Sequence, residues 1–117
     1  MITLQTLKDA TAQQVFDQCK AHLLAQGKKS SALVDGRKTC YYKAGDMKCA
    51  AGCFISKKQY KPSFENETWN SLVDRNAVPE YHSDLIRALQ RIHDGEKPSR
   101  WKSKLNVLEK KLNEYSK

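Results

Sequence analysis

The sequence predicts an α+β fold in a single domain over residues 1–117, with an N-terminal helix, a short β-hairpin and about three C-terminal helices. Three observations support this class. The 117 residues, 39% of them hydrophobic, suffice for one modest core. Near the N-terminus, a helix-start pattern precedes apolar residues at helical spacing. After it, a tight-turn dipeptide joins two runs that favour strands.

The first helix is expected over residues 12–26. Thr11 and Gln14 match a capping box, in which each side chain accepts a hydrogen bond from the other residue's backbone N–H. Gly27 suits the left-handed conformation that ends many helices. The apolar residues between these signals recur at helical spacing and are expected to be buried: Val15, Phe16, Cys19, Leu23 and Leu24.

Two short strands are expected next, at residues 32–34 and 38–42. Asp35-Gly36 lies between them, and this dipeptide favours the positive φ angles of a tight hairpin turn. Gly45-Asp46 is expected to end the second strand. The sequence therefore predicts a two-stranded ribbon in this part of the chain.

The run KCAAGCFI at residues 48–55 is expected to form a short helical turn. Its small residues Ala50, Ala51 and Gly52 leave room for the backbone of another element, or for a bulky ring, to approach closely. Four residues are expected on its buried face: Cys49, Ala50, Cys53 and Phe54.

Three helices are expected in the C-terminal half. A short one carries Trp69, Leu72 and Val73 and ends near Asn76. The next is expected to start at Pro79, because proline suits a first helical position, and its apolar stripe is Tyr81, Leu85, Ile86, Leu89 and Ile92. The last is expected to start at Pro98 and to dock on its own domain through a heptad-spaced seam: Trp101, Leu105, Leu108, Leu112 and Tyr115.

Positive charge is concentrated in residues 28–61. The chain carries 21 basic and 13 acidic residues, a net charge of +8, and this segment holds nine of the basic and two of the acidic ones, a net charge of +7. A cationic surface attracts phosphate backbones, anionic lipid or acidic protein surfaces. The candidate partner-binding residues are the cations and tyrosines of this segment: Arg37, Lys38, Tyr41, Lys43, Lys48, Lys57, Lys58, Tyr60 and Lys61.

The sequence leaves two alternatives for the partner of this segment, a single-stranded nucleic acid or a protein. Cations interleaved with aromatic rings are typical of single-stranded nucleic-acid binders, and Tyr41, Tyr42 or Tyr60 could stack on bases. Aromatic residues beside arginine are also typical of protein–protein hot spots. A small nucleic-acid-binding protein therefore stands as the alternative to a protein-binding one.

The four cysteines have three interpretations. No export signal or membrane span is evident, so we expect reduced thiols in a cytoplasm. Burial as small hydrophobes is the favoured role. A metal site could draw on Cys19, His22, Cys40, Cys49 and Cys53, although gaps of eight and then three residues fit no standard zinc pattern. A reactive thiolate could be favoured by cations near two of them: Lys48 beside Cys49, and Arg37, Lys38 and Lys43 around Cys40.

His93-Asp94 closes the predicted 79–95 helix and could join His22 and His82 in a metal-dependent hydrolase. A histidine in a last turn is more commonly explained by the attraction of its charged form to the helix C-terminus. The chain has no phosphate-binding glycine loop, nucleophile elbow or HExxH, so neither an enzyme nor a cofactor is predicted. A hydrolase or zinc-stabilised module is the third alternative.

Three motifs carry a family resemblance: CYY at residues 40–42, KCAAGCFI at 48–55, which is the most specific, and LQRIHD at 89–94. With the tyrosine and proline loop at 60–62 and with Trp101, they make residues 13–112 resemble a group of small proteins common in tailed phages and prophages. Many of those relatives are acidic around the turn and in the last helix, where this chain has lysines instead: Lys57, Lys58, Lys102, Lys104, Lys110 and Lys111.

The resemblance implies a phage-type accessory protein in the cytoplasm of a bacterial host cell. We expect it to bind and inhibit or modulate a host protein or ribonucleoprotein complex, such as a nucleic-acid-processing system or a defence system of the CRISPR type. The net charge argues against a DNA mimic, which would need carboxylates in place of phosphates. A monomer or a homodimer that acts away from the membrane is expected.

Overall fold

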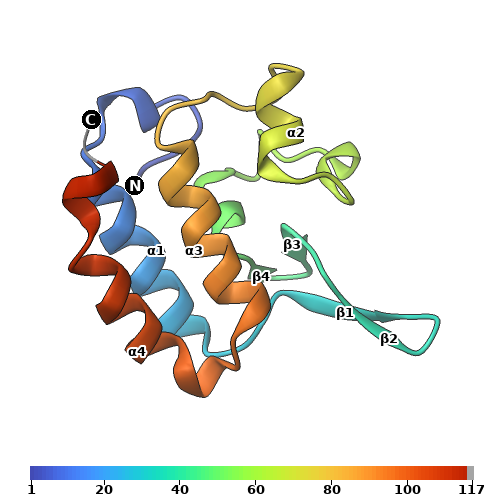
Figure 1. Ribbon diagram of the computed structural model, residues 1–117. Coiled ribbons are helices and arrows are strands. Elements are labelled where there is room, and N and C mark those ends of the chain that lie inside the picture. Colours follow the sequence, from blue (N-terminus) through green and yellow to red (C-terminus); the bar gives the residue numbers. More distant parts are fainter. Residues whose placement is uncertain (116–117) are drawn as a thin grey trace.

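The computed structural model describes residues 1–115, except for the side chains of Val34 and Lys38, and has the α+β architecture that the sequence predicts (Figure 1). Its α-helices are α1 (Ala12–Gln26), α2 (Trp69–Asp74), α3 (Ser83–Gly95) and α4 (Pro98–Glu109). Its strands form two antiparallel hairpins, β1 (Ser31–Val34) with β2 (Arg37–Cys40) and β3 (Lys43–Ala44) with β4 (Met47–Lys48). Short 3₁₀ turns occupy Leu7–Asp9, Ala51–Phe54, Pro62–Phe64 and Leu112–Tyr115.

Helix α1 has the predicted bounds because both of its end signals form. The Thr11 side chain accepts a hydrogen bond from the Gln14 N–H, and the Gln14 side chain accepts one from the Thr11 N–H. Gly27 adopts φ of 67° and ends the helix. Four of the five predicted apolar positions are buried, but Leu24 is 40% exposed. Successive helical residues point about 100° apart, so Leu24 lies beside the buried face that includes Leu23.

The hairpin β1–β2 turns at Asp35 and Gly36, whose φ angles of 52° and 77° are the positive values that this dipeptide favours. The second strand ends at Cys40, so the prediction that it continues to residue 42 is wrong. Gly45-Asp46 does more than end a strand, because it is the turn of the second hairpin, β3–β4. Figure 1 shows β1–β2 projecting away from the helices.

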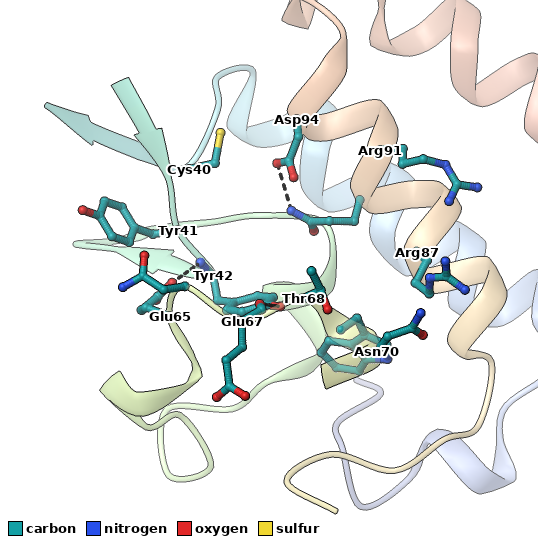
Figure 2. A pocket seen from close by; sticks show the side chains of 13 residues that line it. Cys40, Tyr41, Tyr42, Glu65, Glu67, Thr68, Asn70, Arg87, Arg91 and Asp94 are labelled. Atoms are coloured by element: carbon teal, nitrogen blue, oxygen red, sulfur yellow. Dashed lines mark hydrogen bonds between the residues drawn. The ribbon is translucent and has the colours of Figure 1, made fainter. Parts of the chain in front are cut away.

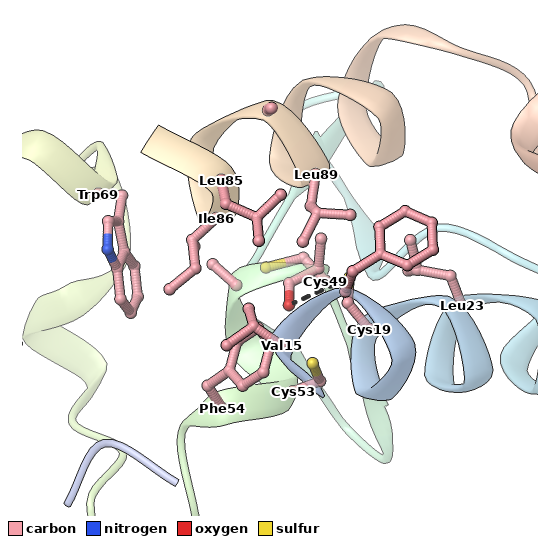
Figure 3. Packing of buried hydrophobic residues seen from close by; sticks show 14 of the residues in the cluster. Val15, Cys19, Leu23, Cys49, Cys53, Phe54, Trp69, Leu85, Ile86 and Leu89 are labelled. Atoms are coloured by element: carbon pink, nitrogen blue, oxygen red, sulfur yellow. Dashed lines mark hydrogen bonds between the residues drawn. The ribbon is translucent and has the colours of Figure 1, made fainter. Parts of the chain in front are cut away.

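Helices α1, α3 and α4 pack against one another, and the 3₁₀ turn Ala51–Phe54 packs against α1 and α3 (Figure 1). The small-residue turn is buried as predicted, with Cys49, Ala50 and Phe54 fully inaccessible and Cys53 9% exposed (Figure 3). Its glycine is required, because a Cβ at Gly52 would collide with the backbone carbonyl of Tyr42. The predicted close approach of another segment is therefore present.

Helix α3 begins at Ser83, and the predicted start at Pro79 is wrong. His82 interrupts the chain with φ of 59°, a left-handed conformation that cannot continue a helix from Pro79. Its ring Nε2 lies 2.7 Å from the Ala10 carbonyl oxygen, which fixes the chain at this point. Tyr81, expected in the apolar stripe, is 50% exposed, whereas Leu85, Ile86 and Leu89 are buried.

Helix α4 starts at Pro98 as predicted and docks on α1 and α3. The helix ends at Glu109, so its heptad seam continues into the 3₁₀ turn Leu112–Tyr115. Four seam residues are buried and Tyr115 is partly buried, so the seam serves the core of this chain: Trp101, Leu105, Leu108, Leu112 and Tyr115.

Candidate functional site

An open groove of about 460 Å³ lies between α3, the end of β2 and the segment 65–70 (Figure 2). Helix α3 supplies Arg87, Gln90, Arg91 and Asp94 to one side. Residues 40–42 and 65–70 supply the other sides and include Tyr41, Glu65, Glu67, Trp69 and Asn70. The groove therefore lies between α3 and the base of the basic ribbon, which is hairpin β1–β2.

The Glu65 side chain connects the residues that follow β2 with the loop that contains Tyr60 and Glu65 itself. Its carboxylate accepts hydrogen bonds from the backbone N–H groups of Tyr42 at 2.9 Å and Lys43 at 3.3 Å, and from the Tyr60 hydroxyl at 2.7 Å. Partial burial, together with this carboxylate, raises the pKa of Tyr60 to about 12, so the phenol stays a donor. The Lys43 ammonium lies 5.7 Å from the centre of the Tyr60 ring. Two predicted partner-binding residues, Lys43 and Tyr60, are thus brought together.

Trp69 lines the groove and carries an unpaired donor. The residue is 3% exposed, and its ring lies 6.3 Å from that of Tyr42. Its indole Nε1 has no hydrogen-bond partner in the described structure. Among the described residues, no other buried side-chain nitrogen or oxygen lacks one. In contrast, the Trp101 Nε1 donates to the Glu96 carbonyl at 3.1 Å. Buried donors are rarely left unsatisfied, so Trp69 is an exception that needs a reason.

The charged groups around the groove differ in how far they are paired. Arg75 Nη2 lies 2.7 Å from the Glu67 carboxylate, and this pairing lowers the pKa of Glu67. Arg87 meets Asp84 at 3.6 Å, but the Asp84 side chain is 84% exposed, and exposed pairs of this kind contribute little. Arg91 is exposed and forms no ion pair with the described residues. Arg91 is therefore free to meet an anion, and Arg87 is restrained, in the described part of the chain, only by its exposed pair with Asp84.

Cys40, His93 and Asp94 meet at one end of the groove, with potential ligand atoms within 4.8 Å of one another. His93 is fully buried and stacks on Trp101 at 5.5 Å. Its Nε2 accepts a hydrogen bond from the Ser30 N–H at 3.0 Å, so the ring proton is on Nδ1, which donates to Asp94 Oδ1 at 2.7 Å. The predicted role of His93 as a charged partner of the helix end is wrong, because the ring is an acceptor for a backbone amide.

This arrangement suits neither a metal ion nor hydrolysis. A metal on Nδ1 would displace its proton, and the neutral ring would then carry a proton on Nε2 that faces the Ser30 N–H. A cysteine hydrolase needs the histidine between the thiol and the carboxylate, whereas both nitrogens of His93 are already engaged by Ser30 and Asp94. We therefore assign the cluster a structural role.

The five-residue metal set predicted from the sequence does not assemble. Cys19, Cys49 and Cys53 are buried in the core, while Cys40 is exposed at the groove. His22 Nε2 is bound to the Lys48 carbonyl oxygen at 2.8 Å, and His82 lies at Ala10. Across the described part of the chain, only Cys40, His93 and Asp94 come close enough to share an ion.

Neither cysteine with neighbouring cations is an activated thiol. Burial raises the pKa of Cys49 well above its usual value, and the Lys48 ammonium donates to the Ile55 carbonyl at 3.0 Å. Burial, followed by the Asp94 carboxylate, raises the pKa of Cys40, against a smaller opposing effect of Lys29. The alternative in which cations favour the thiolate is wrong for both residues, because desolvation, complete at Cys49 and partial at Cys40, raises the pKa of each thiol.

The cations of the basic segment are mostly free. Arg37, Lys57, Lys58 and Lys61 are exposed, whereas Tyr41, Lys43, Lys48 and Tyr60 are partly buried; the side chain of Lys38 lies outside the described residues. Ion pairs of lysine or arginine in the described structure are Lys20–Glu109, Arg75–Glu67, Arg87–Asp84 and Arg100–Glu96. None includes a cation from residues 28–61.

The groove residues that sequence reasoning missed include Trp69, Arg87 and Arg91. Trp69 was assigned to the core as an ordinary apolar residue, and nothing in the sequence indicates that its N–H lacks a partner. A signal was present for the arginines, because residues four positions apart share one face of a helix, and this face lies beside the apolar stripe of α3.

Comparison of the chain with protein-family models, with curated proteins and with solved structures finds no match. No helix within residues 1–115 is long and apolar enough to cross a membrane.

Proposed function

We propose that this chain is a non-catalytic binding protein whose basic surface docks on an acidic surface of a host macromolecular complex and inhibits or modulates that complex. The basic surface consists of Arg37, Lys43, Lys48, Lys57, Lys58 and Lys61. One observation carries the proposal: a segment of net charge +7 forms no ion pairs among its described side chains. Cations that no carboxylate of their own chain neutralises favour encounter with an acidic partner.

The shape of the ribbon supports docking. Hairpin β1–β2 projects from the helices (Figure 1), and Leu33 on it is 72% exposed opposite Lys38. An exposed apolar side chain on a hairpin that also carries the exposed Arg37 resembles the mixture of apolar and charged groups in a protein interface. The ribbon therefore offers a partner both apolar contact and electrostatic attraction.

The arrangement of the tyrosines favours a protein surface over nucleic acid. Tyr42 is 8% exposed, and its hydroxyl donates to the Glu67 carbonyl, so it is not a stacking platform. Tyr60 is held by Glu65 and lies under Lys43. Tyr41 alone of the three candidates remains without such contacts in the described structure. Single-stranded nucleic-acid binders stack successive bases on several rings.

A host setting completes the proposal. On the resemblance to small phage and prophage proteins, we place the activity in the cytoplasm of a bacterial host, with a nucleic-acid-processing or defence complex, such as a CRISPR effector, as the target. An accessory protein of this kind acts by occupying a surface, so its effect should scale with its molar ratio to the target.

The test is a quantitative pull-down from bacterial lysate with the protein as bait, followed by mass spectrometry. Lys57→Glu with Lys58→Glu should reduce recovery of the partner without lowering the melting temperature, because both side chains are exposed and form no ion pair in the described structure. The matched control is Lys110→Glu with Lys111→Glu, an equal charge change at exposed positions beyond α4. The control variant should retain the partner.

Recovery of no protein above background at low and moderate salt would contradict the proposal. Recovery that nuclease treatment abolishes would instead favour the nucleic-acid alternative. In that case the logarithm of affinity for an oligonucleotide should fall linearly with the logarithm of salt concentration, by about 0.7 to 0.9 per phosphate contact.

A further inference from the structure

We propose that the groove between α3 and the segment 65–70 is a carboxylate-binding site, which takes an acidic side chain from an extended segment of the protein partner. The inference rests on the proposed function and specifies the chemistry of the partner. Two observations carry it: the Trp69 N–H has no hydrogen-bond partner among the described residues, and Arg87 and Arg91 of α3 line the same groove.

The Trp69 indole marks the point at which a ligand oxygen is needed. An indole N–H can only donate, and leaving a buried donor unsatisfied costs free energy. Two neighbouring hydroxyls of this wall do have partners: the Tyr42 hydroxyl donates to the Glu67 carbonyl, and the Thr68 hydroxyl accepts from the Ser71 N–H. The indole atom is covered, so an acceptor would reach it by displacing an exposed neighbour such as Asn70.

The arginines supply the charge that selects an anionic acceptor. Arg87 and Arg91 are one helical turn apart on α3, and both line the groove on the side that this helix forms (Figure 2). Arg91 has no ion pair with the described residues, and the only one of Arg87 is with exposed Asp84. Guanidinium groups bind planar carboxylates through paired hydrogen bonds. The indole N–H of Trp69, which lines the same groove, can add a third donor.

The other charges of the groove favour a carboxylate over a phosphate. Glu65, Glu67 and Asp94 also line it, so its carboxylates outnumber its two arginines. A dianionic phosphate, or a chain of phosphates, would meet repulsion along most of the groove, whereas one carboxylate can bind at the arginine end alone. The groove therefore disfavours nucleic acid by charge repulsion, which is independent of the argument from the tyrosines.

The position of the groove favours a protein segment over a free small molecule. The groove is open, and one end is formed by Cys40 and Tyr41 at the base of the basic ribbon. A partner segment that contacts the cations of the ribbon can continue directly into it. An acidic extended segment would thus meet cations at the ribbon and again at Arg87 and Arg91, while the carboxylates of Glu65 and Glu67 that also line the groove are occupied by donors of this chain.

The experiment is a titration of the purified protein followed by ¹⁵N–¹H NMR of the two tryptophan indoles. The probe is a blocked pentapeptide of alternating glutamate and glycine, and its control is the same peptide with glutamine. The acidic peptide should move the Trp69 signal downfield and the glutamine peptide should not. Trp101 is an internal control, because it is fully buried and already donates to Glu96.

Two variants test the donors separately. Arg91→Gln should lower the affinity for the acidic peptide about tenfold. Arg100→Gln on α4 is an equal charge change outside the groove and should leave this affinity unchanged. Trp69→Phe keeps an aromatic ring but removes the N–H, and it should also lower the affinity for the acidic peptide about tenfold. Because this variant has no Trp69 indole signal, binding is followed by the backbone amide signal of Asn70. If Trp69→Phe does not fold, the comparison of Arg91→Gln with Arg100→Gln tests the proposal by itself.

Three results would overturn the inference. The first is an absence of Trp69 shift with the acidic peptide at millimolar concentration, or an equal shift with the glutamine peptide. The second is a stronger response to inorganic phosphate or to an oligothymidylate, which would assign the groove to phosphates. The third is an equal response to acetate, which would assign it to a free small carboxylate. None of these results depends on the lysate partner, so they do not bear on the pull-down.

Discussion

At the scale of single residues, Tyr42 shows how tightly the candidate site is joined to the core. Its N–H donates to Glu65, its hydroxyl donates to the Glu67 carbonyl, and its own carbonyl accepts from the Cys49 N–H at 3.3 Å. Burial is the main cause that raises the pKa of its phenol well above the usual value. The residue is therefore a fixed link between the groove and the small-residue turn, and its carbonyl is packed against Gly52.

This contact predicts the effect of Gly52→Ala. The new methyl group would collide with the Tyr42 carbonyl, whose hydrogen bond to Cys49 resists displacement, so the free energy of unfolding should fall by about 1–3 kcal/mol. Urea denaturation measures this change. The matched control is Gly95→Ala at the end of α3, where an added Cβ meets no atom within 4 Å.

The control should be neutral or stabilising by up to about 1 kcal/mol, since alanine favours a helix over glycine. An equal loss of stability at both positions would show that the Tyr42 carbonyl does not restrict Gly52.

At the scale of elements, α1 shows that helical spacing defines a buried face less sharply than packing does. Leu23 and Leu24 are adjacent, and both match the apolar pattern of the sequence. Leu23 is fully buried, whereas Leu24 is 40% exposed. The position of α3 and α4 against α1 decides which of the two is covered. A pattern based on one helix alone cannot include these neighbours.

The two leucines should therefore differ in their contribution to stability. Leu23→Ala leaves a cavity in the core and should lower the free energy of unfolding by about 2–5 kcal/mol. Leu24→Ala removes a partly exposed side chain and should cost less than about 1 kcal/mol. Both values come from chemical denaturation of the same protein preparation. Similar losses for the two variants would mean that Leu24 is buried in solution, by a rotated helix or by a second copy of the chain.

At the scale of the whole molecule, uneven charge opposes folding as well as attracting a partner. The chain carries a net charge of +8, and the cations of residues 28–61 have no ion pairs among their described side chains. Like charges held near one another repel, and salt screens this repulsion over about 10 Å at 0.1 M. The free protein is thus less stable than its apolar core alone would make it.

The melting temperature should therefore rise by a few degrees as sodium chloride increases from about 20 mM to about 300 mM. The triple variant Lys57→Gln, Lys58→Gln and Lys61→Gln removes three of the exposed cations and should show a smaller rise. Differential scanning calorimetry measures both slopes. A melting temperature that falls with salt would indicate that attractive pairs dominate, contrary to the ion pairs found in the described structure.

Much of the fold was determined by the sequence alone, because its signals are local. The Thr11–Gln14 capping box and Gly27 set the bounds of α1, and Asp35-Gly36 set the first hairpin turn. The buried small-residue turn at residues 49–54 was also predictable, since its composition leaves few alternatives. Each of these features depends on neighbours within a few residues, for which short-range hydrogen bonding and φ preferences decide the outcome.

Only the tertiary structure decided the groove and the roles of the titratable residues. His93 became an acceptor for Ser30, 63 positions away, and the pKa of the Cys40 thiol is raised by desolvation and then by the Asp94 carboxylate, which rules out the alternative of an activated thiolate there. The unpaired N–H of Trp69 exists only because the walls that bury it leave it without an acceptor. Contacts between distant residues depend on how whole elements pack, and desolvation in the packed state then decides which donors, thiols and charges remain free.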